Sequence, residues 1–269
     1  MYVFITASNS LYRSSMDYNV LMAKKRGGYD FETMIDTEFR KRNDTILSIK
    51  QGAGLWLWKP YFIHKALIEE CAEGDILFYL DAAAFFISDV RMIEKVMDDD
   101  IYATCLPYIE ADWTKSEAFD IMDMDKEVYK NSFQYQASFM AFRKSMRSIM
   151  FVEEWLNNCC NPDLINPAQN IGKQIETFQN HRMDQSCFSL LCKKYNVSPH
   201  KDPTQFGIWG YPEVRGARYV GVKMKNEYPI VIVLHRLKDF GLRNKLRLVK
   251  RTMCLISKNI IKNIRRKRC

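Results

Sequence analysis

Charged side chains follow two of the predicted strands at the point where each strand ends. The run Asp75–Leu80 (DILFYL) is apolar after its first residue, which is typical of a strand buried in a parallel sheet, and Asp81 follows it. A carboxylate in this position is costly unless it faces a ligand, a metal ion or a helix cap. His235 follows the last predicted strand, 230–234 (IVIVL), and would lie near Asp81 if both strands belong to one sheet. An aspartate and a histidine supply oxygen and nitrogen ligands suited to Mn²⁺.

Aromatic side chains and one lysine are concentrated in the segment Gly54–Tyr61 (GLWLWKPY). Pro60 suits the first turn of a helix, so Trp58 and Lys59 are predicted at a helix N-terminus. The exposed N–H groups and positive potential of such an end favour a phosphate, to which Lys59 would add its charge. A lysine that is simply solvated is the alternative.

The segment His181–Ser186 (HRMDQS) gathers a base, a cation, an acid and an amide at the start of another predicted helix. An ordinary helix start capped by Asp184 is the alternative. Gln134 and Gln136 bracket the entrance of a predicted strand, after an irregular segment rich in polar and aromatic residues. Each of these groups alone is a weak signal, and their shared position at the ends of strands strengthens the set.

Strands and helices alternate along the first 110 residues, which is typical of an open α/β sheet. Ligands bind such sheets at the carboxyl ends of the strands, where Thr6, Ala7, Ser8 and Asp81 are expected. The predicted strands are 2–7, 30–36, 75–80, 101–106, 137–142 and 230–234, and the predicted helices are 11–26, 56–70, 89–98, 144–160 and 181–195.

These motifs together resemble a known enzyme family. Gly52–Pro60 followed by Gly74–Ala82 (GDILFYLDA), with His181–Ser186 further on, is similar to bacterial GT-A-type glycosyltransferases of capsule and O-antigen synthesis. Gln136–Phe139 and Phe151–Leu156 extend the match, which spans roughly residues 1–236. The resemblance implies a GT-A, Rossmann-like α/β domain with a mixed, mainly parallel sheet flanked by helices. We place this domain at residues 1–240.

The resemblance implies transfer of a hexose from a nucleotide-diphosphate sugar, a UDP-sugar being favoured, to a glycan or lipid-linked acceptor of surface polysaccharide. Asp184 is the candidate for the sugar-facing acid, either as the base of an inverting enzyme or as the group that orients the donor's hydroxyls. Asp81 would contact the donor or its metal-bound diphosphate. The expected donor site is Thr6, Ala7, Ser8, Trp58, Lys59, Asp81, Ala82, Ala83, Gln136, His181, Arg182 and Gln185, and the expected acceptor site is Glu110, Asp112 and Trp113.

The short acidic motif departs from the family pattern, because Asp81-Ala82-Ala83 lacks the second acid of Asp-x-Asp. A Mn²⁺ or Mg²⁺ ion shared by Asp81, His235 and the diphosphate is one expectation. Neutralisation of the leaving diphosphate by Lys59, Arg182 or Arg236 is the other. The rival functions are a nucleotidyltransferase, for which a Gly-rich basic loop after the first strand is missing, and a non-catalytic glycan- or membrane-binding protein with a decayed site.

The net charge of +8 is concentrated in a C-terminal tail. From Arg236 onward there are 13 Lys or Arg residues against Asp239 alone, so the tail carries +12 and the preceding chain −4. Apolar residues at steps of three and four predict one amphipathic helix within 241–269. They are Leu242, Leu246, Val249, Met253, Ile256, Ile260 and Ile264.

A basic amphipathic helix of this kind can lie on an anionic membrane surface, where each basic residue contributes about 1 kcal/mol. Packing on the body of the protein, or against a second copy in a homodimer, is the alternative. No apolar run is long enough to span a membrane, and no nucleic-acid-binding motif accompanies the charge. We therefore expect a cytoplasmic protein, peripheral on the inner face of the cytoplasmic membrane, with its cysteines reduced and no nucleic-acid partner.

Overall fold

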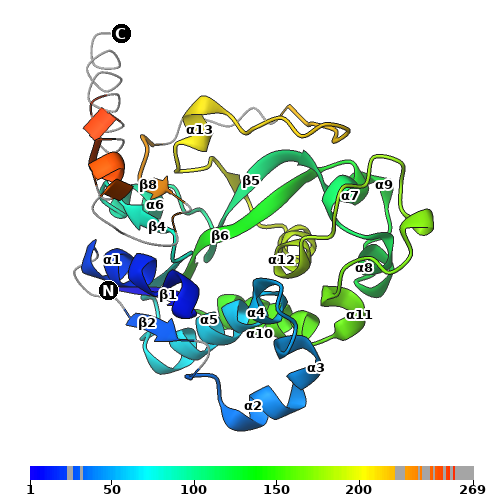
Figure 1. Ribbon diagram of the computed structural model, residues 1–269, viewed down its shortest axis with the longest axis horizontal. Helices are drawn as coiled ribbons and strands as arrows, with labels where there is room; N and C mark the ends of the chain where they lie inside the picture. The colour runs from blue at the N-terminus through cyan, green and yellow to red at the C-terminus, as the bar shows by residue number, and fades with distance from the viewer. Residues whose placement is uncertain are drawn as a thin grey trace.

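A six-stranded mixed sheet forms the centre of the protein in a computed structural model, with strands in the order β2-β1-β3-β6-β5-β7 (Figure 1). The structure describes residues 1–22, 27–30, 33–221, 228–235, 237, 243–244, 246–250, 253–254 and 257. Three of the five strand pairings are parallel: β1 (Tyr2–Ser8) with β2 (Gly27–Asp30) and with β3 (Ile76–Leu80), and β5 (Ile101–Ile109) with β7 (Pro199–His200). The long strand β6 (Phe133–Arg143) runs antiparallel to β3 and β5. The predicted α/β class with a mixed, mainly parallel sheet is confirmed.

Both faces of the sheet are covered, as the apolar sequence of β3 predicts. Alternate residues of a strand point to opposite faces. Leu77 and Tyr79 pack in the largest apolar cluster, against α5 (Trp58–Glu69), α10 (Met146–Cys159) and α12 (Met183–Lys194). Ile76, Phe78 and Leu80 pack in a second cluster on the other face, with residues of α6 (Arg91–Glu94) and of two short strands, β4 (Ala84–Phe86) and β8 (Ile232–Leu234).

The last strand does not join the central sheet. β8 pairs antiparallel with β4 in a separate two-stranded ribbon, so the premise that His235 and Asp81 end strands of one sheet is wrong. The ribbon nevertheless stays close to Asp81, because β4 begins three residues after it. The backbone N–H of His235 donates to the carbonyl of Ala83 (2.9 Å).

Several predicted boundaries move. The second strand is Gly27–Asp30 instead of 30–36, because Asp36 caps α2 (Thr37–Arg42) by accepting from the N–H of Phe39 at 2.9 Å. The segment expected to be irregular after Tyr108 contains three short helices, α7 (Glu110–Trp113), α8 (Ser116–Ile121) and α9 (Glu127–Lys130). The remaining helices are η1 (Ser10–Tyr12), α1 (Arg13–Met22), α3 (Asp44–Leu47), α4 (Gly52–Leu55), α11 (Pro162–Ile165), η2 (Ile171–Lys173) and α13 (Phe206–Trp209).

The described residues between 243 and 257 are helical and lie beside the ribbon (Figure 1). Leu248 is 3% exposed and packs against Phe85, Ile230 and Val233. Three members of the predicted apolar stripe face away from this contact: Leu246, Val249 and Met253 are 63%, 46% and 64% exposed. The stripe members Leu242, Ile256, Ile260 and Ile264 lie outside the described residues.

The described part of the chain contains seven of the eight cysteines. The seven cysteines found there are free, and five of them are buried. None of the helices described is long and apolar enough to cross a membrane.

Candidate active site

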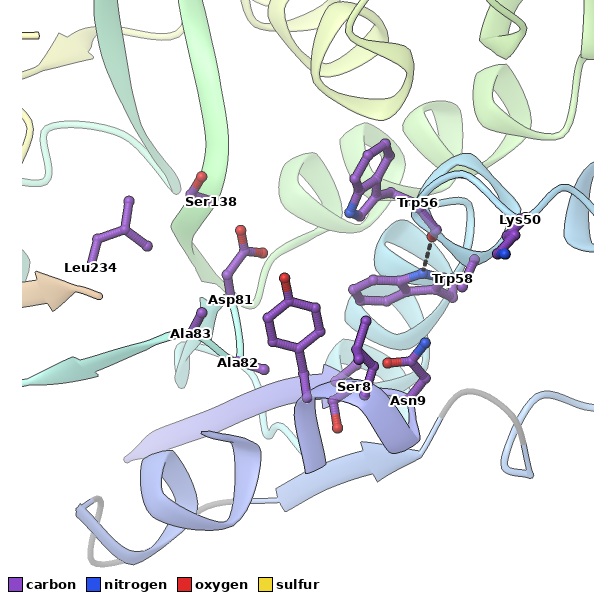
Figure 2. A pocket seen from close by; sticks show the side chains of 15 residues that line it. Ser8, Asn9, Lys50, Trp56, Trp58, Asp81, Ala82, Ala83, Ser138 and Leu234 are labelled. Carbon is purple, nitrogen blue, oxygen red and sulfur yellow. Dashed lines mark hydrogen bonds between the residues drawn. The ribbon is translucent and has the colours of Figure 1, made fainter. Parts of the chain in front are cut away.

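A cleft of about 520 Å³ opens where β1 and β3 end, at the edge where α/β sheets bind ligands (Figure 2). One wall is the segment between Lys50 and Trp58, and Ser138 of β6 and Leu234 of β8 line it as well. Asp81 projects into this space in Figure 2. The full lining is Ala7, Ser8, Asn9, Leu11, Tyr12, Lys50, Gly52, Ala53, Trp56, Trp58, Asp81, Ala82, Ala83, Ser138 and Leu234.

Half of the residues expected to bind the donor line this cleft. They are Ala7, Ser8, Trp58, Asp81, Ala82 and Ala83. The other six lie behind the lining or beyond it: Thr6, Lys59, Gln136, His181, Arg182 and Gln185. Sequence reasoning missed Lys50. Its only signal in the sequence was its place just before the glycine-rich segment Gly52-Ala53-Gly54. Sequence reasoning also missed Asn9, Leu11 and Tyr12, which follow β1 directly.

The wall between Lys50 and Trp58 is built on a left-handed turn, because α4 (Gly52–Leu55) departs from right-handed helix geometry. Five consecutive residues have positive φ: Gly52 (57°), Ala53 (48°), Gly54 (93°), Leu55 (54°) and Trp56 (62°). Each non-glycine residue in this conformation costs roughly 1–2 kcal/mol. The Trp56 ring packs so closely on Gly52 that a Cβ there would lie 2.4 Å from it, and the Trp58 indole N–H donates to the Gly52 carbonyl (3.0 Å). The turn thus fixes both indoles at the cleft, and such strain is typical of functional sites.

Asp81 is the acidic residue of the cleft lining, and neighbouring groups fix its carboxylate. Its side chain is 32% exposed. The Tyr79 hydroxyl donates to Asp81 Oδ1 (2.8 Å), and Lys59 Nζ lies 3.7 Å from the same oxygen. The backbone N–H of Asp81 donates to the Ser138 carbonyl (2.8 Å). The carboxylate is therefore held in place while it remains open to a ligand.

Lys59 and Asp184 form a buried ion pair behind Asp81. Lys59 Nζ lies 2.9 Å from Asp184 Oδ2, both side chains are 5% exposed, and Lys59 also donates to the Ala137 carbonyl (2.9 Å). Burial raises the pKa of Asp184 to about 6, although the Lys59 ammonium opposes the shift. Burial lowers the pKa of Lys59, but the carboxylates of Asp184 and Asp81 outweigh it and hold that pKa above its ordinary value. Lys59 is therefore a charged internal residue here, which differs from the expected open phosphate ligand.

A chain of hydrogen bonds connects this ion pair to Arg182. The Ala137 N–H donates to Gln185 Oε1 (3.2 Å), and Gln185 Nε2 donates to Gln134 Oε1 (2.9 Å). Arg182 Nη1 donates to the same Gln134 oxygen (3.1 Å), and its guanidinium stacks 3.8 Å from the Trp113 ring centre. Arg182 and Gln185 therefore meet in one network.

Gln136 and His181, which were also expected to bind the sugar donor, are internal residues as well. Gln136 is buried and donates to the Thr104 hydroxyl (3.0 Å). His181 is fully buried, accepts at Nδ1 from the Lys115 N–H (3.3 Å) and lies 3.0 Å through Nε2 from the Leu164 carbonyl. Burial, followed by the nearby Lys115 charge, lowers the pKa of His181 to about 3, so the ring is neutral. In this structure His181 ties α8, α11 and α12 together.

The expected acceptor residues on α7 are buried. Glu110 is fully buried and pairs with Lys193, while Ser189 and Thr114 donate to it. Asp112 is also fully buried and pairs with Arg218 at 2.8 Å. Trp113 is mostly covered and carries Arg182 on its face. Both carboxylates thus hold together the segments around them, and the acceptor role expected for these residues stays a prediction.

Asp81 and His235 do not form a metal site by themselves. The His235 ring is largely buried, and its Nδ1 accepts from the Leu237 N–H (2.9 Å). Within the part of the chain that the structure describes, no three His, Cys, Asp or Glu residues are grouped so that they could hold a metal ion. The described side chains therefore do not by themselves fit a Mn²⁺ or Mg²⁺ site.

No protein-family model matches the chain, and no curated protein sequence matches it. Solved structures with a similar arrangement include mouse xyloside xylosyltransferase 1 (10% identity, TM-score 0.44, 89% of this chain and 99% of that one). The galactosyltransferase LgtC, crystallised with donor and acceptor sugar analogues, gives 9% identity and a TM-score of 0.40 over 96% of each chain. The glycosyltransferase GlyE of Streptococcus pneumoniae gives 11% and 0.44 over 97% of this chain and 64% of its own.

Proposed function

We propose that the chain is a glycosyltransferase that moves a hexose from a nucleotide-diphosphate sugar, with a UDP-sugar favoured. One observation carries the proposal. Ala7-Ser8, Trp58 and Asp81–Ala83 come from segments far apart in the sequence, and they line one cleft at the carboxyl ends of β1 and β3. The last two segments belong to the motifs that resemble capsule and O-antigen glycosyltransferases.

The cleft supplies groups suited to a sugar nucleotide. Indole rings such as Trp56 and Trp58 offer flat apolar faces to a base or a sugar ring. Ser8, Asn9 and Ser138 add hydroxyl and amide groups for hydrogen bonds. Asp81 is the carboxylate placed to accept from a ligand hydroxyl, and it is held ready for that contact by Tyr79.

In this proposal Asp184 acts on the cleft through Lys59. It is buried, and Lys59 lies between it and Asp81, at 2.9 Å from Asp184 and 3.7 Å from Asp81. A pKa near 6 would suit a general base at neutral pH, which keeps the base role open for a state in which the site rearranges around substrate. The orientation of Asp81 is the role that the present geometry supports.

We also propose a glycan or lipid-linked acceptor of surface polysaccharide, met at an anionic membrane surface on the cytoplasmic side. Support comes from the exposed apolar residues Leu246, Val249 and Met253, which turn away from the Leu248 contact. At 3.6 residues per turn Arg243 and Lys250, both exposed, border one edge of that exposed side. An apolar stripe bordered by positive charge suits the boundary of anionic headgroups and acyl chains.

The proposal is tested by a thermal-shift screen against UDP-, GDP-, CMP- and TDP-sugars, each with and without Mn²⁺. A donor at 100 times its Kd stabilises the native state by about 2.7 kcal/mol, which raises Tm by roughly 5–10 °C in a chain of this size. Dependence on Mn²⁺ would support a metal shared by Asp81 and the diphosphate. No shift with any nucleotide sugar, together with no donor hydrolysis, would favour the non-catalytic alternative, for which the missing second acid speaks.

A transfer assay on the variant Asp81→Asn, with Asp120→Asn as the control, tests the role of Asp81. Asp120 is exposed on α8 and does not line the cleft. We expect Asp81→Asn to abolish transfer with an unchanged circular-dichroism spectrum, while Asp120→Asn behaves as wild type. Wild-type transfer by Asp81→Asn would remove Asp81 from the site.

A further inference from the structure

The described lining of the cleft contains one basic residue, Lys50, and one acidic residue, Asp81. Figure 2 shows Lys50 on the side of Trp56 and Trp58, across the cleft from Asp81 and Ser138. The cleft is therefore electrically polar, with a cation at one side and an anion at the other. A ligand that carries both negative charge and hydroxyl groups has one favourable orientation in such a field.

Of the three cations expected to neutralise the diphosphate, Lys59 and Arg182 are engaged elsewhere, and Arg236 lies outside the described residues. Lys59 is buried against Asp184 and the Ala137 carbonyl. Arg182 is stacked on Trp113 and hydrogen-bonded to Gln134. Lys50 is exposed, and its ammonium forms no ion pair or hydrogen bond with the residues that the structure describes.

The backbone of Lys50 is fixed by the left-handed turn. Its carbonyl accepts from the Ala53 N–H (3.2 Å), and the carbonyl of the preceding residue, Ile49, accepts from the Gly54 N–H (2.8 Å). The strained turn thus anchors Lys50 at the edge of the wall that carries both indoles. An ammonium on a flexible stem at such an anchor can follow a charged group within the cleft.

We propose that Lys50 binds the diphosphate of the nucleotide ligand, and that the ligand lies with its diphosphate toward Lys50 and hydroxyl groups toward Asp81. This inference rests on the proposed function and names the residue that recognises the anionic part of the donor. It assigns to Lys50 the role that the sequence motifs gave to Lys59. A diphosphate placed beside Asp81 instead would meet a like charge.

The test compares binding by wild type, Lys50→Met, Lys50→Arg and the control Lys41→Met, measured calorimetrically on the full chain. Lys41 is exposed on α2 and does not line the cleft. The probes are UDP, GDP, CDP and TDP, each beside its nucleoside, and inorganic pyrophosphate. A hydrogen bond to a charged group contributes about 1.5–3 kcal/mol, so Lys50→Met should weaken the bound nucleoside diphosphate roughly 10- to 100-fold. Nucleoside affinity should not change, Lys50→Arg should keep most of the binding, and Lys41→Met all of it.

The outcomes separate this inference from the proposed function. Wild-type affinity for the nucleoside diphosphate in Lys50→Met would overturn the role of Lys50 and leave glycosyl transfer standing. If wild type binds no nucleotide, the proposed function fails, and pyrophosphate decides about Lys50. Pyrophosphate binding that Lys50→Met abolishes would keep Lys50 as an anion site, and pyrophosphate binding that is absent or unchanged would overturn it.

Discussion

Replacing Lys59 by methionine removes the positive charge from a buried cluster that holds two carboxylates. Asp184 would lose its ion-pair partner at 2.9 Å in a setting where only 5% of its side chain is exposed. Breaking a buried pair by removing one partner costs about 3–5 kcal/mol. For a chain of this size each kcal/mol lowers Tm by about 2–4 °C, so we expect a loss of roughly 6–20 °C at pH 8.

The loss should depend on pH with a defined sign. The pKa of Asp184 is about 6 in the native protein, above its ordinary value of 3.8. Between these values the native state binds the proton more tightly than the unfolded state, so native stability falls as pH rises through this window. Without Lys59 the pKa of Asp184 rises further, and the carboxyl stays neutral at pH 5. The Tm difference between Lys59→Met and wild type should therefore be small at pH 5 and large at pH 8.

Two further variants control this experiment, with Tm followed by circular dichroism from pH 5 to pH 8. Lys65→Met changes a partly exposed lysine of the same helix, whose ion pair with Glu69 (3.9 Å) is a surface pair worth about 0–1 kcal/mol. Lys59→Met combined with Asp184→Asn should recover part of the loss, because no buried charge is then left unpaired. A Lys59→Met protein that melts like Lys65→Met at every pH would refute the buried ion pair.

The remaining predictions concern other parts of the molecule. His181→Gln should make the free energy of unfolding, measured by urea titration, less sensitive to acid. The pKa of His181 is about 3 in the folded protein against 6.5 in the unfolded chain, so the stability that it contributes is complete above pH 6.5 and is lost toward pH 3. An unchanged dependence of the unfolding free energy on pH would contradict this. Gly54→Ala should lower Tm more than Gly74→Ala, since both have positive φ but only the Cβ at 54 would meet backbone, 2.9 Å from Leu47 Cα; equal effects would contradict the close approach. Arg243→Glu with Lys250→Glu should reduce sedimentation with phosphatidylserine vesicles, at about 1 kcal/mol per basic residue, while Lys41→Glu with Lys65→Glu should not; equal loss in both pairs would mean that the tail contributes only nonspecific charge.

The sheet could be predicted from the sequence because its strands carry strong local signals. β3 is almost wholly apolar, and residues such as Leu77 and Phe78 have to be buried on opposite faces whatever the topology. The helices α5, α10 and α12 appeared within a few residues of their predicted bounds. The pairing of β8 could not be predicted, because an apolar run of five residues fits a central strand and a ribbon equally well.

The site was predicted better in its location than in its contacts. Ser8 is the last residue of β1 and Asp81 directly follows β3, so topology alone places them at the cleft edge. Whether a charged side chain is open or buried depends on partners distant in sequence. Lys59 finds Asp184 125 residues away, and Asp112 finds Arg218 106 residues away, and no local pattern announces either pair. The left-handed turn was equally hidden, since Leu55 and Trp56 rarely adopt positive φ.

The contact of Leu248 with the ribbon means that the C-terminal helix also supports the body of the protein. Cutting the chain after residue 240 would uncover Phe85 and Val233 of the ribbon and the neighbouring Ile230, and Leu234 of the same ribbon lines the cleft. Such a truncated protein would lose activity through a damaged cleft wall, whether or not the helix binds a membrane. The two sides of this helix should also vary separately among related sequences. Position 248 should accept only residues that fill the same space between Phe85, Ile230 and Val233. Positions 246, 249 and 253 should vary with the surface that the outward side of the helix binds.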